Sequence, residues 1–201
     1  DIPVDTVELS TQQQLVRDSI RSICSEFDDE YWRQKDIDGE YPSEFADALA
    51  EGGWFGILIP EEYGGADMGT PETVVMFEEI ALNGGGFSGA QAFHGGIYNS
   101  APLVKYGSEE LKSELLPEVA RGETAIQAFG LTEPNSGSDS TAMETSAEPD
   151  GDGYVINGQK IWISRVDQSD YMLLMARTTP RDEVEKRTRG ISMFLVDIEE
   201  A

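Results

Sequence analysis

The spacing of apolar residues changes once along this 201-residue chain, and the change falls in a polar segment from Gln127 to Ala142. Before this segment apolar residues recur at the spacing of amphipathic helices, and after it they alternate as in strands. Two classes of element that are separated along a chain form separate layers or separate domains. We therefore expect a helical domain at 1–124 and a β domain at 125–201.

Start and stop signals predict where the helices of the first part lie. The expected starts are Thr11, Pro42, Thr70, Phe87 and Ser108. The signal at Thr70-Pro71-Glu72 is strong, because proline suits the first helical position and an acid suits the positive helix end. The first helix is expected to run for about twenty residues and to include Tyr31. The fourth is expected to span 87–106, and the fifth to be interrupted at Pro117.

The second part is predicted to be strands joined by turns. Segments 145–149 and 154–156 flank the turn Asp150-Gly151-Asp152-Gly153, which is typical of a β-hairpin. Further strands are expected at 160–164, 171–178 and 190–198.

The chain carries 39 acidic and 14 basic residues, a net charge of −25. Such a surface repels nucleic acids and anionic lipid, so we expect neither as a partner. The acids are spread along the chain, unlike a single acidic interaction tail. We expect a halophilic protein, one that works in concentrated salt, because 1 M salt screens the repulsion between its acidic residues within about 3 Å. The alternative is an acidic protein that works at ordinary salt concentrations.

Other features favour the cytoplasm. No apolar run approaches the roughly 18 residues of a membrane span, and the N-terminal residues 1–5 show no signal-peptide pattern. The single cysteine, Cys24, excludes an internal disulfide and is expected to be a small buried apolar residue. No metal site is expected.

The segment from Gln127 to Ala142 is also the candidate ligand site. It supplies hydroxyl groups and main-chain amides, and Gly137 allows the chain to come close to a ligand. The same residues could instead form an ordinary loop that caps a helix. The ordered combination from Leu131 to Asp139, Leu-Thr-Glu-Pro-x-x-Gly-Ser-Asp, favours the ligand site.

Gly130-Leu131-Thr132-Glu133 with Gly137-Ser138-Asp139 closely resembles the signature of the acyl-CoA dehydrogenase family of flavoproteins. A second element, Asn157 to Ser164 (NGQKIWIS), resembles the family segment Asn-Gly-x-Lys-x-Trp-Ile-Ser/Thr. Parts of the helical region, at 58–65 and 105–123, are similar too, so the resemblance covers nearly the whole chain. One departure is Arg165, where the family commonly has Asn, and it puts the local turn in doubt.

The resemblance implies a site for FAD. The cofactor-binding residues that it implies are Phe129, Gly130, Leu131, Thr132, Ser138, Trp162, Ile163 and Ser164. Trp162, which taken alone would more often be a core residue, would pack against the isoalloxazine. The Ser164 hydroxyl would bond flavin N5, and Ser138 would lie between the cofactor phosphates and the acyl-CoA substrate.

The resemblance also implies the fold class and the reaction. The fold is α+β: an all-helical N-terminal domain, then an antiparallel β-barrel-like domain that is incomplete in this chain, with the family's C-terminal four-helix domain outside it. The reaction is α,β-desaturation of an acyl-CoA thioester by a homo-oligomer, a tetramer or a dimer, with electrons passed to an electron-transfer flavoprotein. The family's base is a Glu of the later helical domain, so no catalytic residue is assigned in this segment. The alternatives are an acyl-CoA oxidase, a flavin monooxygenase, or a split or degenerate member that binds a partner without chemistry.

Several charged residues have competing interpretations. His94, the only histidine, is expected to be a polar residue in or beside a helix rather than a base, although the resemblance places it on the segment that lines the acyl-tail pocket. Glu133 and Asp139 are expected to fix the loop through backbone N–H bonds rather than to act as an acid–base pair. The densest basic cluster is formed by Lys186, Arg187 and Arg189. This cluster either contacts CoA phosphates or is a solvated loop.

Overall fold

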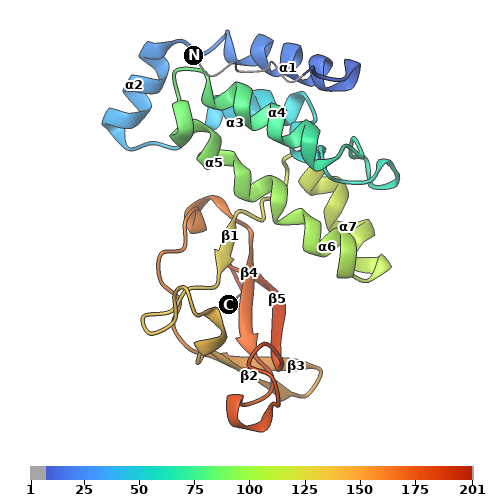
Figure 1. Cartoon of the computed structure of the whole chain (residues 1–201), viewed down its shortest axis with the longest axis vertical. Coiled ribbons are helices and arrows are strands. Elements are labelled where there is room, and N and C mark those ends of the chain that lie inside the picture. Colours follow the sequence, from blue (N-terminus) through green and yellow to red (C-terminus); the bar gives the residue numbers. More distant parts are fainter. Residues whose placement is uncertain (1–7, 201) are drawn as a thin grey trace. The chain divides into compact units, whose positions relative to one another are not determined.

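The computed structural model describes residues 8–200, and the chain divides into two compact units, the first ending at Glu123 and the second starting at Thr124 (Figure 1). The prediction about a signal peptide concerns residues 1–5, which lie outside the described residues. Across 8–200, none of the helices combines the length and the apolar character that crossing a membrane requires.

The first unit is helical. Its helices are α1 (Thr11–Cys24), α2 (Asp29–Asp38), α3 (Ser43–Glu51), α4 (Thr70–Ala81), α5 (Gly86–Tyr98), α6 (Ser100–Tyr106) and α7 (Glu109–Ala120). Two short 3₁₀ turns, Trp54–Gly56 and Glu61–Tyr63, lie between α3 and α4. The core forms where α1, α3, α4 and α5 meet, around the fully buried rings of Phe45 and Phe93. Cys24 is 1% exposed in this core, which confirms its prediction.

Three helix predictions are wrong in their extent. The first predicted helix is two helices, because Asp28 starts a new one by accepting a hydrogen bond from the Tyr31 N–H at 2.9 Å. The helix predicted at 87–106 is divided at Asn99 between α5 and α6.

Pro117 does not interrupt α7, which continues to Ala120. A proline near the end of a helix removes one hydrogen bond only, and buried Leu116 and Val119 hold this turn in place.

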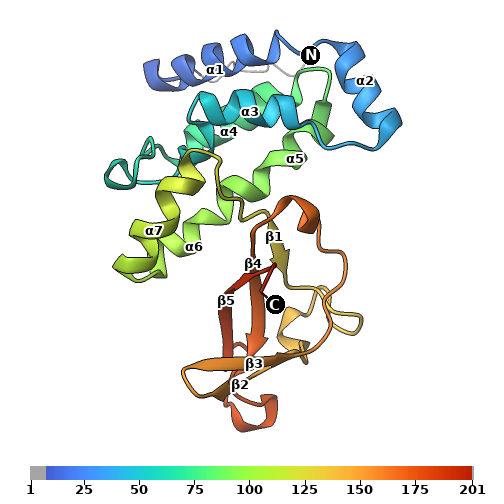
Figure 2. The same cartoon turned by 180° about the vertical axis from the view of Figure 1, so that it is seen from behind.

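The second unit contains a five-stranded sheet. Its strands are β1 (Ala128–Gly130), β2 (Ser146–Asp150), β3 (Gly153–Asn157), β4 (Tyr171–Arg177) and β5 (Ile191–Asp197). The central strand is β4, which pairs with β5 along its whole length and with β1 and β2 on its other edge (Figure 2). The predicted hairpin is confirmed as β2 and β3.

The predicted order of a helical domain followed by a β domain is confirmed, but the sheet is mixed rather than antiparallel. Both β1 and β2 run parallel to β4. A long segment of chain separates β1 from β4 and β2 from β4. Parallel neighbours need such a long connection, because a hairpin turn can join only antiparallel strands. One of those connections contains 160–164, the segment that was wrongly predicted to be a strand.

Candidate functional site

The loop that leaves β1 is folded back on itself at Glu133. The Glu133 N–H donates to the Ser136 carbonyl at 2.9 Å, and the Ser136 N–H donates to the Glu133 carbonyl at 3.1 Å. The Ser136 hydroxyl then donates to the carbonyl of Asp139 at 3.0 Å. These bonds fix the turn and leave Gly137 and Ser138 exposed at its tip.

The Glu133 carboxylate ties this loop to the start of β2. It accepts from the main-chain N–H groups of Glu144 at 2.6 Å and Thr145 at 3.0 Å, and from Lys160 Nζ at 2.8 Å. Burial acts to raise the pKa of Glu133, but the bonds from Glu144, Lys160 and Thr145 outweigh it and hold the pKa at about 2. The prediction that Glu133 fixes the loop through backbone N–H bonds is confirmed.

Lys160 and Ile161 bring the second sequence motif against the first. Lys160 Nζ donates to the Leu131 carbonyl at 3.2 Å, and the Ile161 N–H donates to the Thr132 carbonyl at 2.9 Å. Gly158 packs so closely on Thr145 that a Cβ there would collide with the threonine side chain. The segments 131–133, 144–145 and 158–161 therefore meet around one buried carboxylate.

Trp162 has an unusual backbone and an unusual exposure. Its φ of 60° is left-handed, a conformation that costs a non-glycine residue roughly 1–2 kcal/mol. A residue in this conformation cannot continue a β-strand, so 160–164 is not a strand. The tryptophan is 86% exposed. Trp162 is therefore not a core residue of the described chain.

The turn after Ser164 is also left-handed, at Arg165 with φ 64° and ψ 28°. Asparagine adopts this conformation more readily than arginine does. The turn is therefore present although this chain departs from the family pattern here, and arginine is a less favourable residue for it than asparagine.

The residues proposed to contact a cofactor lie on three neighbouring segments of the second unit. Phe129 and Gly130 belong to β1 and pair with Leu173 and Leu174 of β4. Leu131 and Thr132 follow them, half-buried, and Ser138 is exposed on the loop. Ile163 is half-buried and Ser164 exposed, beside Trp162.

Within residues 8–200, the N–H groups of Gly137 and Ser138 make no main-chain hydrogen bond, so they can serve a ligand as donors.

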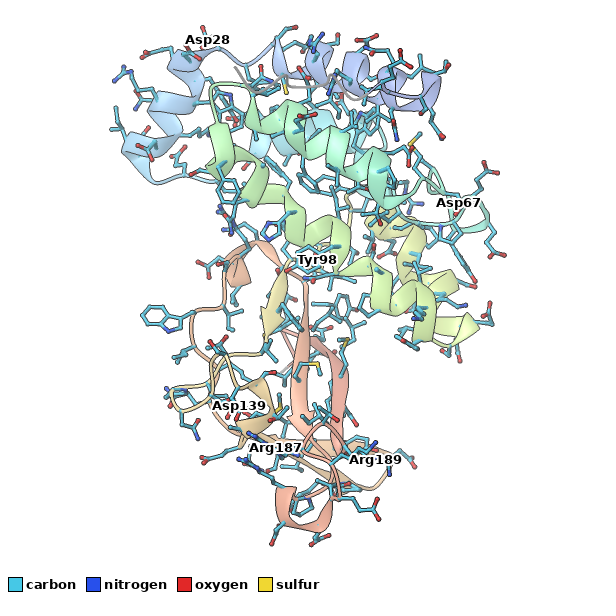
Figure 3. The ribbon with its side chains drawn as sticks, in the orientation of Figure 1. Asp28, Asp67, Tyr98, Asp139, Arg187 and Arg189 are labelled. Atoms are coloured by element: carbon cyan, nitrogen blue, oxygen red, sulfur yellow. The ribbon has the colours of Figure 1, made fainter. Side chains whose placement is uncertain are left out.

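The geometry of Asp139 differs from the prediction. Its carboxylate accepts from the Thr141 hydroxyl at 2.5 Å and pairs with Arg187, in place of backbone N–H groups (Figure 3). The hydrogen bond from Thr141 and the charge of Arg187 lower the pKa of Asp139. Both loop acids are therefore held ionised by their partners and are poorly suited to exchange protons near neutral pH.

His94 lies in the helical unit, on α5. Its Nδ1 is 2.6 Å from the carbonyl of Gln91, and its ring lies 5.1 Å from that of Tyr98. The prediction of a polar residue in a helix is confirmed.

Two residues that hold the site together were not identified from the sequence. The Ser169 hydroxyl accepts from the N–H groups of Gln127 and Ala128 and donates to the Arg165 carbonyl, which fastens β1 to the turn after Ser164. Arg177, 6% exposed, donates to the carbonyls of Thr141 and Met143. An arginine within the apolar strand 171–178 was the available signal.

Comparisons with known proteins follow the same division of the chain. Residues 10–123 match the family model "Acyl-CoA dehydrogenase, N-terminal domain", and residues 128–201 match "Acyl-CoA dehydrogenase, middle domain". The chain is 34% identical to the caffeyl-CoA reductase-Etf complex subunit CarC of Acetobacterium woodii, over 94% of this chain and 48% of that protein.

Solved structures are similar in fold, and two of them illustrate the similarity. The glutaryl-coenzyme A dehydrogenase glutaryl-CoA complex matches with a TM-score of 0.84 and 32% identity, over 94% of this chain and 47% of that one. The FAD complex of PigA matches with a TM-score of 0.83 and 25% identity, over 94% and 49%. The chain thus spans about half the length of the proteins it matches.

Proposed function

The chain belongs to the acyl-CoA dehydrogenase family, and from that membership we propose that its protein carries out FAD-dependent α,β-desaturation of an acyl-CoA thioester. We propose an electron-transfer flavoprotein as the electron acceptor, with support from the relative in a reductase–Etf complex. The observation that carries the cofactor assignment is the exposed, left-handed Trp162 beside the loop that holds Thr132 and Ser138.

The residues present fit a flavin. Trp162 offers a flat apolar face that its own chain does not cover. The N–H groups of Gly137 and Ser138, with the hydroxyls of Thr132, Ser138 and Ser164, offer donors for the polar atoms of a cofactor. Phe129 and Leu131 add apolar surface next to these donors.

Bound FAD would supply the acceptor for the hydride that leaves the β-carbon of the thioester in the proposed reaction. The residues of this chain would hold and orient the cofactor, and Trp162 would contact its ring while the Ser164 hydroxyl would supply a hydrogen bond to it. Glu133 acts on this arrangement indirectly, by fixing the segments of Thr132 and Ile161. We assign the proton-abstracting base to no residue of this chain, because Glu133 and Asp139 are both held by hydrogen bonds and cations.

The domain bounds, the oligomeric state, the cellular location and the adaptation to salt are proposed from the sequence. We keep domains at 1–124 and 125–201, a homo-oligomer (tetramer or dimer), and a cytoplasmic location for which the buried free thiol of Cys24 is the support. Adaptation to high salt is proposed from the net charge of −25.

The test uses the intact protein in concentrated salt. Oxidised flavin should be visible in its absorption spectrum, and thioesters from butyryl- to palmitoyl-CoA should reduce that flavin without oxygen and turn over with an artificial electron acceptor. A protein with neither bound flavin nor turnover would contradict the proposal.

Three variants of the assay separate the alternatives. Oxygen consumption that supports turnover would identify an oxidase or a monooxygenase. Faster reaction of the unsaturated thioester with a reduced acceptor would favour the reverse reaction, for which the reductase relative gives a reason. Flavin and activity that appear only with a second protein would identify a split member.

A further inference from the structure

The chain contains four asparagines, and two of them, Asn83 and Asn157, precede a glycine. Asparagine is a thermolabile residue, because the main-chain nitrogen of the next residue can attack its side-chain amide. The attack is fastest before glycine, which has no side chain to hinder it. It requires a side-chain amide and a following N–H group that no hydrogen bond restrains, and the four asparagines differ in these restraints.

The Asn83-Gly84 site is restrained by its surroundings. Asn83 Nδ2 donates to the carbonyl of Glu79 at 2.6 Å, so the side chain is held against the last turns of α4. Gly84 packs on α2, where a Cβ would lie 2.7 Å from Oδ1 of Asp29. Both the amide that would be attacked and the residue that would attack it are therefore held in place.

The two asparagines that precede serine are restrained as well. Asn99 is 1% exposed, and Ser100 after it is fully buried. Asn135 is exposed, but the N–H of the next residue, Ser136, donates to the carbonyl of Glu133 at 3.1 Å. The nitrogen that would attack Asn135 is therefore occupied by a hydrogen bond.

The Asn157-Gly158 site lacks these restraints. Asn157 is the last residue of β3 and pairs with Ser146 at the open end of the hairpin that β3 forms with β2 (Figure 2). Asn157 and Gly158 are both exposed. In the part of the chain that the structure describes, neither the side-chain amide of Asn157 nor the N–H of Gly158 makes a hydrogen bond. Strand ends open more easily than strand centres, so the main chain here can rotate into the geometry for attack.

We propose that Asn157 is a site of spontaneous deamidation in the folded protein. The Gly158 nitrogen gives its proton to water and bonds to Cγ of Asn157, while the bond from Cγ to Nδ2 breaks and ammonia leaves. Water then opens the resulting succinimide ring at one of its two carbonyl groups and produces aspartate or isoaspartate. No oxidant or reductant takes part, and each product adds one negative charge. The inference is independent of the proposed function.

Isoaspartate changes the main chain where the structure has no spare room. The Cβ of the former asparagine enters the main chain and lengthens it just before Gly158. Gly158 packs so closely on Thr145 that an added Cβ would already collide with the threonine side chain. Two residues later, Lys160 donates to the Glu133 carboxylate at 2.8 Å. Formation of isoaspartate therefore displaces the segment 158–161 and weakens the pair of Lys160 with Glu133.

The test follows deamidation by peptide mass mapping of the intact, folded protein during incubation at mildly alkaline pH. Replacement of the amide by a hydroxyl group changes the mass, whereas isomerisation of an aspartate does not. Asn157 should deamidate about fivefold or more faster than Asn83, since one hydrogen bond restrains the Asn83 amide and is worth about this factor. In concentrated urea the two sites should react at comparable rates, because the local sequence alone then decides. Equal rates at Asn83 and Asn157 in the folded protein would overturn the inference, and so would an Asn157 that reacts only in urea.

The structural consequence is tested on aged protein. After incubation the wild type should melt at a lower temperature than a fresh sample. Asn157→Gln should prevent most of this loss, because glutamine would have to form a larger ring and reacts more slowly. The matched control is Asn135→Gln, which removes another exposed asparagine and should age as the wild type does. A loss in Asn157→Gln as large as that in the wild type would contradict the assignment of the damage to residue 157.

Discussion

The ammonium Nζ of Lys160 lies 2.8 Å from Oε1 of Glu133, where only 8% and 3% of the two side chains are exposed. Glu133 belongs to the loop after β1, and Lys160 to the segment after β3. The pair therefore joins the two motifs that hold Thr132 and Trp162. A buried ion pair adds little net stability over an apolar pair, but the loss of one partner leaves a charge without compensation.

Glu133→Gln and Lys160→Met should each lower the free energy of unfolding by about 3–5 kcal/mol. The control is Glu30→Gln, which breaks an exposed pair with Arg33 and should change the stability little. Urea unfolding of the three variants measures the difference. A loss in Lys160→Met no larger than that in the control would show that the buried pair does not hold the motifs together.

Stability should depend on pH through the same carboxylate. The pKa of Glu133 is about 2 in the folded chain, against an ordinary value of 4.5. Since the folded pKa is the lower one, the stabilisation is complete above pH 4.5 and is lost as the pH falls towards 2. The shift corresponds to about 3 kcal/mol. The stability difference between the wild type and Glu133→Gln should therefore shrink over this range, and a constant difference would contradict the assignment.

Local signals predicted much of the fold, and contacts distant in sequence account for the errors. The start of α7 was predictable because Ser108 caps it, accepting from the Leu111 N–H at 3.2 Å. Ile161 and Ile163 alternate with polar or exposed residues as in a strand, whereas the left-handed backbone of Trp162 has no sequence signal. The two residues before it, Lys160 and Ile161, are held by bonds to Leu131, Thr132 and Glu133, about thirty positions earlier in the chain.

The candidate site shows the same limit. Its residue types could be recognised from motifs, yet the sequence did not indicate that Glu133 and Lys160 would meet. Arg177 illustrates this further, since its partners are main-chain carbonyls at 141, 143, 187 and 189, and any residue type supplies a carbonyl.

Arg165→Asn should stabilise the protein by about 0.5–1 kcal/mol, because asparagine tolerates the left-handed region better than arginine. The matched control, Arg121→Asn, lies at a right-handed position with φ −86° and ψ −4° and should give no such gain. Thermal unfolding of both variants measures the difference. A lower melting temperature for Arg165→Asn would mean that the arginine side chain contributes more than its backbone costs.

The melting temperature should rise steeply between about 0.05 and about 3 M KCl, because salt screens the repulsion within a chain of net charge −25. Neutralising the exposed acids Glu26, Asp36 and Glu110 should make the rise shallower, since less repulsion then remains to be screened. A flat curve for the wild type would remove the proposal of adaptation to salt and leave the enzyme proposal unaffected.

The most direct test of the flavin site is a titration of the intact, flavin-depleted protein with FAD, followed by flavin fluorescence, for the wild type and Trp162→Ala. The loss of ring contact should weaken binding by about 1–3 kcal/mol, which is roughly 5- to 150-fold in Kd. Tyr106→Ala removes a comparably exposed aromatic ring, 76% exposed against 86%, from the helical unit and should bind FAD as the wild type does. Unchanged affinity in Trp162→Ala would contradict the placement of the flavin ring on Trp162.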